Sequence, residues 1–326
     1  MKLDTPSHVK EYLVKTHIAA EKEDPVVENL SGGVSCSVWK VTLNGRHWVL
    51  KQALDRLNVK EDWFSDVKRI HREHEVIQAL NNIIAKGTVP VVLHTDYHHH
   101  VYMMESVEEA MTWKELLMQG DFNKKVAQNA GYLLKNIHSD STKLPSGIKA
   151  ALRDLTYFSQ LRLNPFHRSL IQKYPALLSS IQALINELIQ HTTCLVHGDF
   201  SPKNMLVRKN CQIVLIDFEV AHWGNPVFDL AYCIGHLMLK GWFLEREKDS
   251  LGLIRVFLSA YGDSASNLIP HLGLMLLARI DGKSPVNYIK DESMKNIIRR
   301  TAISWILEKS ENPNVLQTIQ SGFNAE

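Results

Sequence analysis

The sequence holds three polar side chains at a spacing that suits phosphoryl transfer. Asp199 is followed by four residues and then Asn204, and Asp217 stands thirteen residues further on, at the end of an apolar run. In sites of this form the first Asp faces the attacking hydroxyl, whereas the Asn and the second Asp hold metal ions on the phosphates of ATP. Each short motif is a weak signal alone, but their order and spacing together indicate phosphoryl transfer that depends on ATP and Mg²⁺.

This spacing requires a tight loop followed by a hairpin. A step of five residues on a tight loop allows Asp199 and Asn204 to point into one pocket, and a hairpin after Asn204 returns Asp217 to the same place. We therefore expect Asp199 to be the catalytic residue and Asn204 and Asp217 to be the metal ligands.

A glycine pair near the N-terminus is a candidate phosphate loop. Gly32 and Gly33 lie in a turn between two expected strands, Val26–Leu30 and Cys36–Val41. Paired glycines allow backbone N–H groups to approach an anion closely, because no side chain intervenes. Ser35 could add a hydroxyl donor. A plain hairpin turn is the alternative.

A lysine on the next expected strand is a candidate phosphate ligand. In His47–Gln52, Trp48 and Leu50 share one face and Val49 and Lys51 share the other. A lysine at this place can pair with the α- and β-phosphates of ATP. A solvated strand lysine is the alternative.

The helix expected at residues 62–80 should supply a carboxylate that holds this lysine in place. Glu73 is our first choice and Glu75 is the second. The alternative is an exposed, charged helix face with no such role.

The character of the chain changes from strands to helices after Met104, Glu105 and Ser106. We expect an N-terminal lobe over residues 1–105 and a C-terminal lobe over residues 106–326. The extended link offers backbone groups that could bind adenine, although methionines there could equally fill a core.

Length and composition indicate an ordinary soluble enzyme. A chain of 326 residues is long enough for two lobes, and 37 basic and 35 acidic residues give a net charge of +2, which does not favour nucleic-acid binding. The four cysteines form no Cys-x-x-Cys pair, so neither a disulfide framework nor a structural zinc site is expected. We see no signal peptide and no apolar run that could span a bilayer, and therefore expect no membrane partner and a cytoplasmic location.

The stretches HGDFSPKN, LIDFE and GNPVFDLA together resemble the aminoglycoside phosphotransferase and choline kinase-like family. The resemblance extends from about Leu30 to Ala231. It implies an α+β, bilobal protein-kinase-like fold, with a small N-lobe built on an antiparallel sheet and a larger, mainly helical C-lobe. It also implies a kinase that phosphorylates a small molecule.

The resemblance assigns roles to individual residues. Asp229 is expected to brace the catalytic loop through backbone contacts, and His197 to form hydrogen bonds rather than act as an acid or base. The remaining roles are a catalytic residue (Asp199), Mg²⁺ ligands (Asn204 and Asp217), a phosphate-positioning pair (Lys51 and Glu73), a phosphate loop (Gly32 and Gly33) and an adenine hinge (Met104, Glu105 and Ser106).

Two departures from protein kinases favour a small acceptor. Gly198 stands where a regulated protein kinase has Arg, and only eleven residues separate Asp217 from Asp229. So short a segment cannot serve as a long activation segment that also binds a peptide. We therefore expect transfer of the γ-phosphate of ATP to a hydroxyl group of a small molecule.

Two alternatives belong to other classes. One is a catalytically silent kinase fold that acts as a binding or regulatory module. Silent folds usually lose the lysine, the catalytic Asp or the metal Asp, whereas this chain keeps Lys51, Asp199, Asn204 and Asp217. The other is a protein or glycated-protein kinase, which the short segment after Asp217 disfavours.

The sequence leaves the acceptor open. An aminoglycoside, a methylthioribose-like sugar, choline or ethanolamine, and another metabolite alcohol are all compatible with the motifs. A cationic acceptor would need carboxylates or aromatic faces, for which the candidates are Glu219, Trp223, Trp242 and Asp281. No single pattern predicts the oligomeric state.

Overall fold

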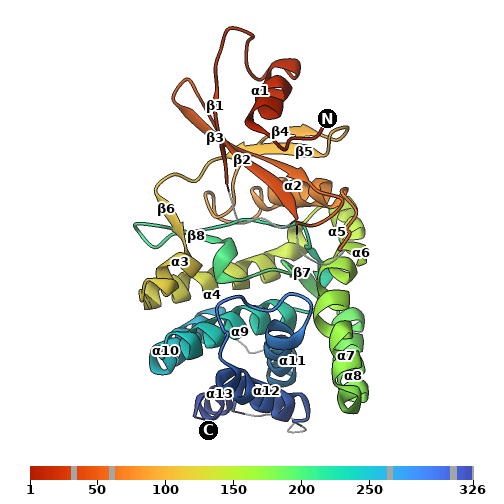
Figure 1. Cartoon of the computed structure of the whole chain (residues 1–326), viewed down its shortest axis with the longest axis vertical. Coiled ribbons are helices and arrows are strands. Elements are labelled where there is room, and N and C mark those ends of the chain that lie inside the picture. The colour runs from red at the N-terminus through yellow and green to blue at the C-terminus, as the bar shows by residue number, and fades with distance from the viewer. Residues whose placement is uncertain (31–34, 59–62, 263–266, 309–313, 325–326) are drawn as a thin grey trace. The chain divides into compact units, whose positions relative to one another are not determined.

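The structure is a computed structural model of the chain and describes residues 1–30, 35–58, 63–262, 267–308 and 314–324 (Figure 1). The chain divides into two units, Met1–Glu108 and Glu109–Glu326. Gly32 and Gly33, the candidate phosphate loop, lie outside the described residues.

The first unit is built on one antiparallel sheet, in which the strands follow the order β1-β2-β3-β5-β4. Helices α1 and α2 pack against this sheet (Figure 1). The elements are α1 (Pro6–Lys15), β1 (Val26–Asn29), β2 (Cys36–Leu43), β3 (Arg46–Ala53), α2 (Arg69–Leu80), β4 (Val92–Asp96) and β5 (Val101–Glu105).

The two faces of β3 have different tasks, as the alternation in the sequence predicts. Leu50 is fully buried among residues of α1 and β2, and Trp48 packs against the same cluster. Lys51 points to the other face and forms an ion pair with a residue of α2. Because neighbouring side chains on a strand alternate between faces, burying Leu50 directs Lys51 toward α2.

Helix α2 begins at Arg69, so the expected start at residue 62 is wrong. A turn precedes the helix, in which the Asp66 carboxylate accepts a hydrogen bond from the backbone N–H of Lys68. The buried Arg69 side chain also donates to the carbonyl groups of Ser65 and Asp66. These bonds stabilise a turn where helical periodicity alone predicts a further two turns of helix.

The second unit is mainly helical, with two small antiparallel sheets of order β6-β8-β9 and β10-β7. Its elements up to the second sheet are β6 (Ala110–Thr112), α3 (Trp113–Met118), α4 (Lys124–Asp140), η1 (Ser141–Lys143), α5 (Ser146–Leu152), α6 (Thr156–Phe158), η2 (Ser159–Arg168), α7 (Ser169–Lys173), η3 (Pro175–Leu177), α8 (Leu178–Gln190), β7 (Cys194–Val196), η4 (Pro202–Asn204), β8 (Met205–Arg208), β9 (Ile213–Leu215) and β10 (His222–Gly224). The elements that follow are α9 (Val227–Phe243), α10 (Glu247–Tyr261), α11 (Leu268–Asp281), α12 (Glu292–Ile306) and α13 (Val315–Phe323).

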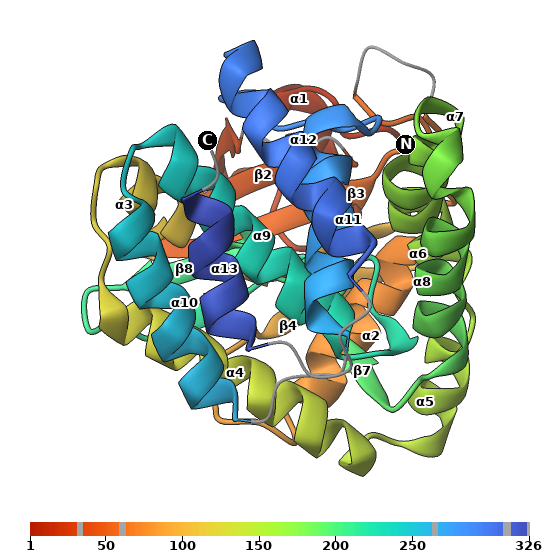
Figure 2. The same ribbon diagram turned by 90° about the horizontal axis from the view of Figure 1, so that it is seen from below.

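Helix α9 is the core of the second unit. It lies between α10 and α11 and is buried from Val227 to Trp242 (Figure 2). Helix α12 packs closely on α11 at Gly273, which has no Cβ atom. A Cβ atom there would lie only 2.7 Å from the carbonyl oxygen of Ala302. No helix in the described ranges is long and apolar enough to cross a membrane.

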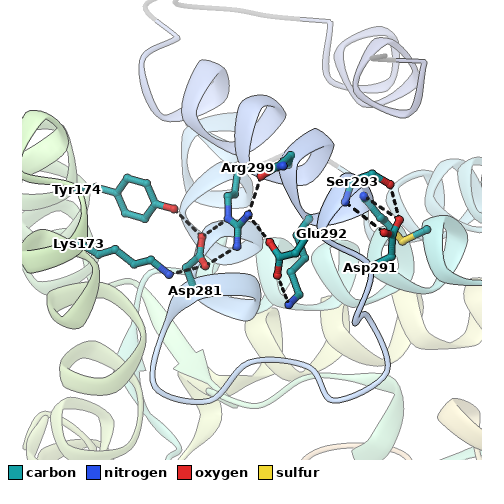
Figure 3. A network of polar contacts seen from close by, with 10 residues as sticks. Lys173, Tyr174, Asp281, Asp291, Glu292, Ser293 and Arg299 are labelled. Carbon is teal, nitrogen blue, oxygen red and sulfur yellow. Dashed lines mark hydrogen bonds and ion pairs between the residues drawn. The ribbon is translucent and has the colours of Figure 1, made fainter.

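A polar network joins α11 and α12 to the end of α7 (Figure 3). The Asp281 carboxylate, whose side chain is 3% exposed, accepts hydrogen bonds from Lys173, Tyr174 and Arg299. Its two oxygens therefore already have partners, so Asp281 stabilises the helix packing and is a poor candidate for a contact with a cationic acceptor.

These partners determine how Asp281 responds to pH. Burial alone would raise the pKa of its carboxyl group, but the hydrogen bonds from Arg299, Lys173 and Tyr174 lower the pKa to about 2. A group whose pKa is depressed in the folded state stabilises the fold above its unfolded-state pKa. That stabilisation is lost as the pH falls toward the folded-state pKa.

We predict that Asp281→Asn lowers the free energy of unfolding by roughly 1–3 kcal/mol at neutral pH, because Arg299 and Lys173 each lose a buried charged partner. The variant should also lose less stability than the wild type between about pH 4 and pH 2. Urea unfolding at a series of pH values measures both effects. Asp291→Asn is the matched control: Asp291 caps α12 and Asn also caps helices well. Equal behaviour of the two variants would contradict the structural role of Asp281.

Candidate active site

The loop after β7 and the β8–β9 hairpin bring the three predicted chemistry-bearing residues to one place. The Asn204 side-chain amide donates to the backbone carbonyl of Asp199 over 2.9 Å. The hairpin pairs Met205 with Leu215, and the N–H of Ile216 then donates to the carbonyl of Asn204 over 3.0 Å. Asp217, the next residue, is close enough for its charge to act on the Asp199 carboxyl group.

Asp229, in the first turn of α9, holds the start of this loop. Its two oxygens accept the backbone N–H groups of His197 and Gly198 over 2.7 and 2.9 Å. This confirms the expected bracing role. His138, which the sequence did not indicate, donates from its ring to the same carboxylate over 3.3 Å. Burial would raise the pKa of Asp229, but the hydrogen bond and charge of His138 lower it.

His197 also has a structural role, as expected. Its ring accepts a hydrogen bond from the N–H of Asp199 over 3.0 Å, and its other nitrogen lies 3.1 Å from the carbonyl of Ile216. Burial lowers its pKa below the ordinary value for histidine, more than the nearby carboxylates raise it. The neutral ring thus joins the catalytic loop to the hairpin.

Gly198 is required by its backbone conformation. It has a φ of +78°, and a Cβ atom there would lie 2.8 Å from the carbonyl oxygen of Val220. Any other L-residue would be strained at this φ and would clash with that carbonyl. The absence of an arginine at this position therefore has a steric cause.

Asp199 is buried between two cations that the sequence analysis missed. One of its carboxylate oxygens, Oδ2, lies 2.9 Å from both Arg162 and Lys203. Burial alone would raise the pKa of this carboxyl group, but the charges of Lys203 and Arg162 lower it below the usual value. The other oxygen, Oδ1, is buried and has no hydrogen-bond partner among the described residues.

Arg162 is fixed in place by its own hydrogen bonds. It lies in η2, a stretch of π-helix, and donates to the carbonyls of Gly198 and Leu161 over 2.8 Å each. The carboxylates of Asp199, Glu219 and Asp217 all act on its charge. Its distance in sequence from the catalytic loop explains why no local motif could reveal it. Lys203, by contrast, stands in the motif itself.

Asn204 and Asp217 provide the donor atoms that Mg²⁺ prefers. An amide oxygen and a carboxylate are hard oxygen ligands, and protein Mg²⁺ sites commonly use few side chains together with substrate phosphates and water. Asp217 has a φ of +73°, which is uncommon for a residue with a side chain and occurs preferentially at functional sites. No group of three His, Cys, Asp or Glu side chains in the described ranges could hold a metal by itself. The residues therefore fit a metal shared with a nucleotide.

The first unit contains the candidate phosphate-positioning pair. The Lys51 ammonium lies 2.8 Å from a carboxylate oxygen of Glu73, and the two side chains are 7% and 0% exposed. Glu75 instead accepts a hydrogen bond from Tyr97. Of the two glutamates considered, Glu73 is thus the one that pairs with Lys51.

The other nucleotide-site candidates stay predictions. Ser35 is buried and its carbonyl accepts from the Arg69 side chain and from the N–H of Leu54, which leaves the predicted role of its hydroxyl untested. In the expected hinge, Met104 is buried, and the N–H groups of Glu105 and Ser106 donate to carbonyls of the same unit. An adenine ring at Glu105 and Ser106 would therefore have to use carbonyl groups.

Comparison with known proteins identifies the family. The model of the phosphotransferase enzyme family matches residues 26–266. A 4-hydroxytryptamine kinase of Psilocybe cyanescens is 22% identical over 279 residues, which cover 75% of this chain and 76% of that protein. A methylthioribose kinase of Yersinia pseudotuberculosis is 26% identical over 217 residues, or 59% of this chain; the match spans 53% of that kinase, about half its length.

Solved structures support the same fold. A spectinomycin phosphotransferase in complex with ADP and spectinomycin has a TM-score of 0.55 and 15% identity, and the match covers 99% of this chain and 94% of that one. The phosphotransferase APH(2″)-IIa, in a ternary complex with streptomycin and ATP, has a TM-score of 0.53 and 18% identity over 98% and 99% of the two chains. These findings confirm the fold class and the resemblance inferred from the motifs. The chain belongs to the phosphotransferase enzyme family, has a protein-kinase-like fold, and is by class a small-molecule kinase.

Proposed function

We propose that the chain transfers the γ-phosphate of ATP to a hydroxyl group of a small molecule, with Asp199 as the catalytic base. The observation that carries this proposal is the asymmetry of the Asp199 carboxylate. Arg162 and Lys203 hold one oxygen, whereas the other is buried and has no partner among the described residues. A fixed carboxylate with one free oxygen is suited to accept the proton of an acceptor hydroxyl.

In this mechanism Asp199 positions the nucleophile more than it activates it. Its Oδ1 accepts a hydrogen bond from the hydroxyl and aligns the oxygen with the γ-phosphorus. The bond between the γ-phosphorus and the bridging oxygen of ADP breaks as the new O–P bond forms, and the hydroxyl proton passes to Asp199. Because the neighbouring cations lower the pKa of this carboxyl group, proton transfer comes late. This order suits the loose transition state of phosphoryl transfer.

The remaining roles follow the chemistry of the side chains. Asn204 and Asp217 would hold Mg²⁺, which when bound would offset the charge of the phosphates. Glu73 fixes the ammonium of Lys51 for the phosphates that are not transferred. Gly32, Gly33, Ser35, Met104, Glu105 and Ser106 remain predicted nucleotide contacts.

The named relatives support ATP as donor and a small molecule as acceptor. They include kinases of 4-hydroxytryptamine and methylthioribose and phosphotransferases crystallised with ADP or ATP. The family match and the kinases among these relatives disfavour the two alternatives, a silent binding module and a protein or glycated-protein kinase. A cytoplasmic location stays a prediction from the sequence, and it suits an enzyme that uses ATP.

We predict that Asp199→Asn lowers kcat by a factor on the order of 10² or more while ATP binding changes little, because the variant cannot take the proton. ADP release over a panel of hydroxyl compounds with ATP and Mg²⁺ measures turnover, and calorimetry measures ATP binding. Asp291→Asn, a surface change of the same kind, is the control. Near-normal turnover of a folded Asp199→Asn variant would rule out the assigned role.

We also predict that Glu73→Gln lowers kcat/KM for ATP by about tenfold or more, since Lys51 would lose its charged partner. Glu75→Gln is the matched control on the same helix, where the carboxylate accepts a hydrogen bond from the Tyr97 hydroxyl. The same ADP-release assay at varied ATP concentration makes the comparison. A larger effect at Glu75 than at Glu73 would exclude this assignment.

A further inference from the structure

Helix α9 contains a buried lysine that the mechanism above does not use. Lys240 is 2% exposed, and its ammonium has one hydrogen bond, to the carbonyl of His236 over 3.4 Å. The cations that act on it are Lys114 and Arg279, the Cys233 thiol opposes them, and within the described part of the chain no carboxylate is among the groups that act on it. Burying a positive charge without an acid beside it is unfavourable, and a buried group of this kind is a candidate for a functional site.

Unpartnered polar atoms surround this lysine. Nε2 of His236, the hydroxyl of Tyr288 and Nε of Arg279 are all buried and have no hydrogen-bond partner among the described residues. The Lys240 ammonium lies 5.6 Å from the centre of the Tyr288 ring. Because buried polar groups in native proteins nearly always have partners, several orphans in one cluster point to an absent ligand.

The electrostatic environment of the cluster is positive throughout. Burial lowers the pKa of His236 well below its usual value, and the charges of Lys240, Arg279 and Lys203 add to this shift. Burial, and then the charges of Lys114 and Arg279, lower the pKa of Lys240 to about 7. Burial disfavours any charge here, but Lys114 and Arg279 act on both groups as cations, and a negatively charged group would offset their charge.

The cluster is connected to the catalytic aspartate through one aromatic ring. The guanidinium groups of Arg162 and Arg279 lie 5.4 and 5.3 Å from the centre of the Phe166 ring. Arg162 in turn contacts Asp199. Tyr232 lies on α9 one turn before His236, and the centre of its ring is 5.8 Å from the Arg162 guanidinium. The Phe166 ring thus contacts both Arg279 of the basic cluster and Arg162, the partner of the catalytic aspartate.

The groups considered for a cationic acceptor are occupied elsewhere. Trp242 is buried against Phe323, with ring centres 5.0 Å apart. Glu219 is buried and acts on Arg162, and Asp281 is held by the network of Figure 3. Trp223 is half-buried in the short strand β10. No uncommitted carboxylate is thus found beside the cluster in the part of the chain described here.

We propose that Lys240, Arg279, His236 and Tyr288 form a binding site for an anionic group, a carboxylate or a phosphate, carried by the acceptor. The acceptor is then a hydroxy acid or a phosphorylated alcohol, and not an aminoglycoside or choline. The assignment of this anion to the acceptor rests on the kinase function proposed above, whereas the anion site itself does not.

Binding of inorganic phosphate and sulfate, measured by calorimetry and by the shift of Tm, tests the site without any turnover. The wild type should bind these anions, and Lys240→Met should lose at least tenfold in affinity. Lys248→Met, on the exposed surface of α10, is the matched control and should bind as the wild type does. Without anions, Lys240→Met should be as stable as the wild type or more so, because an unpaired buried charge is removed.

A second variant protects the test against misfolding. Tyr288→Phe removes one hydroxyl and keeps the ring, so it should fold and should weaken anion binding several-fold. No anion binding by the wild type, or equal binding by wild type, Lys240→Met and Tyr288→Phe, would overturn the proposal.

Paired acceptors distinguish an acceptor site from a site for free anions. Initial rates are compared for D-gluconate against D-glucose and for D-glycerate against glycerol, with ATP and Mg²⁺. We expect the acid of a pair to have a KM at least tenfold lower, and this preference to vanish in Lys240→Met but persist in Lys248→Met. Preference for the neutral compound of each pair would refute the acceptor assignment. Anion binding that depends on Lys240 in an enzyme that transfers phosphate to no compound of the full hydroxyl panel would instead support the site and refute the kinase function.

Discussion

The catalytic loop depends on one buried carboxylate. Asp229 accepts the backbone N–H groups of His197 and Gly198 and a ring N–H of His138. The two backbone donors lie in a loop that adopts a φ of +78° at Gly198, where no helix or strand could satisfy them, and His138 reaches the same carboxylate from α4. Because buried N–H groups need partners, removing this carboxylate would leave two backbone N–H groups unpaired and would destabilise the loop conformation. The position of Asp199 follows from this brace.

Two cations contact one oxygen of the Asp199 carboxylate, and none contacts the other among the described residues. Arg162 and Lys203 offset a set of carboxylates that includes Asp217 and Glu219. The cations hold one oxygen of Asp199 and leave the other to a hydroxyl. An ionised, immobile carboxylate with one oxygen held by cations can orient a nucleophile with its other oxygen. Positioning of this kind is the main contribution of the protein to a reaction with a loose transition state.

How much the sequence predicts depends on whether the geometry is local. Asp199, Asn204 and Asp217 lie on one loop and one hairpin, so their spacing alone predicts that they converge. The choice of Glu73 over Glu75 depends on the rotation of α2, which is fixed only when the helix packs on the sheet. Arg162 reaches Asp199 from a π-helical segment far away in the sequence, and no periodicity predicts that contact.

The two ends of α9 each contain a buried charged residue, and the two residues differ in the partners that the protein supplies. Asp229 in its first turn is a buried acid whose oxygens are all satisfied by donors of the protein. Lys240, eleven residues or about three turns later, is a buried cation beside orphaned donors and other cations. Both side chains lie on a helix that is buried almost throughout, so the charge of each needs hydrogen-bond partners or a group of opposite charge beside it. The protein supplies that compensation for Asp229, and a negatively charged ligand is the compensation that Lys240 lacks.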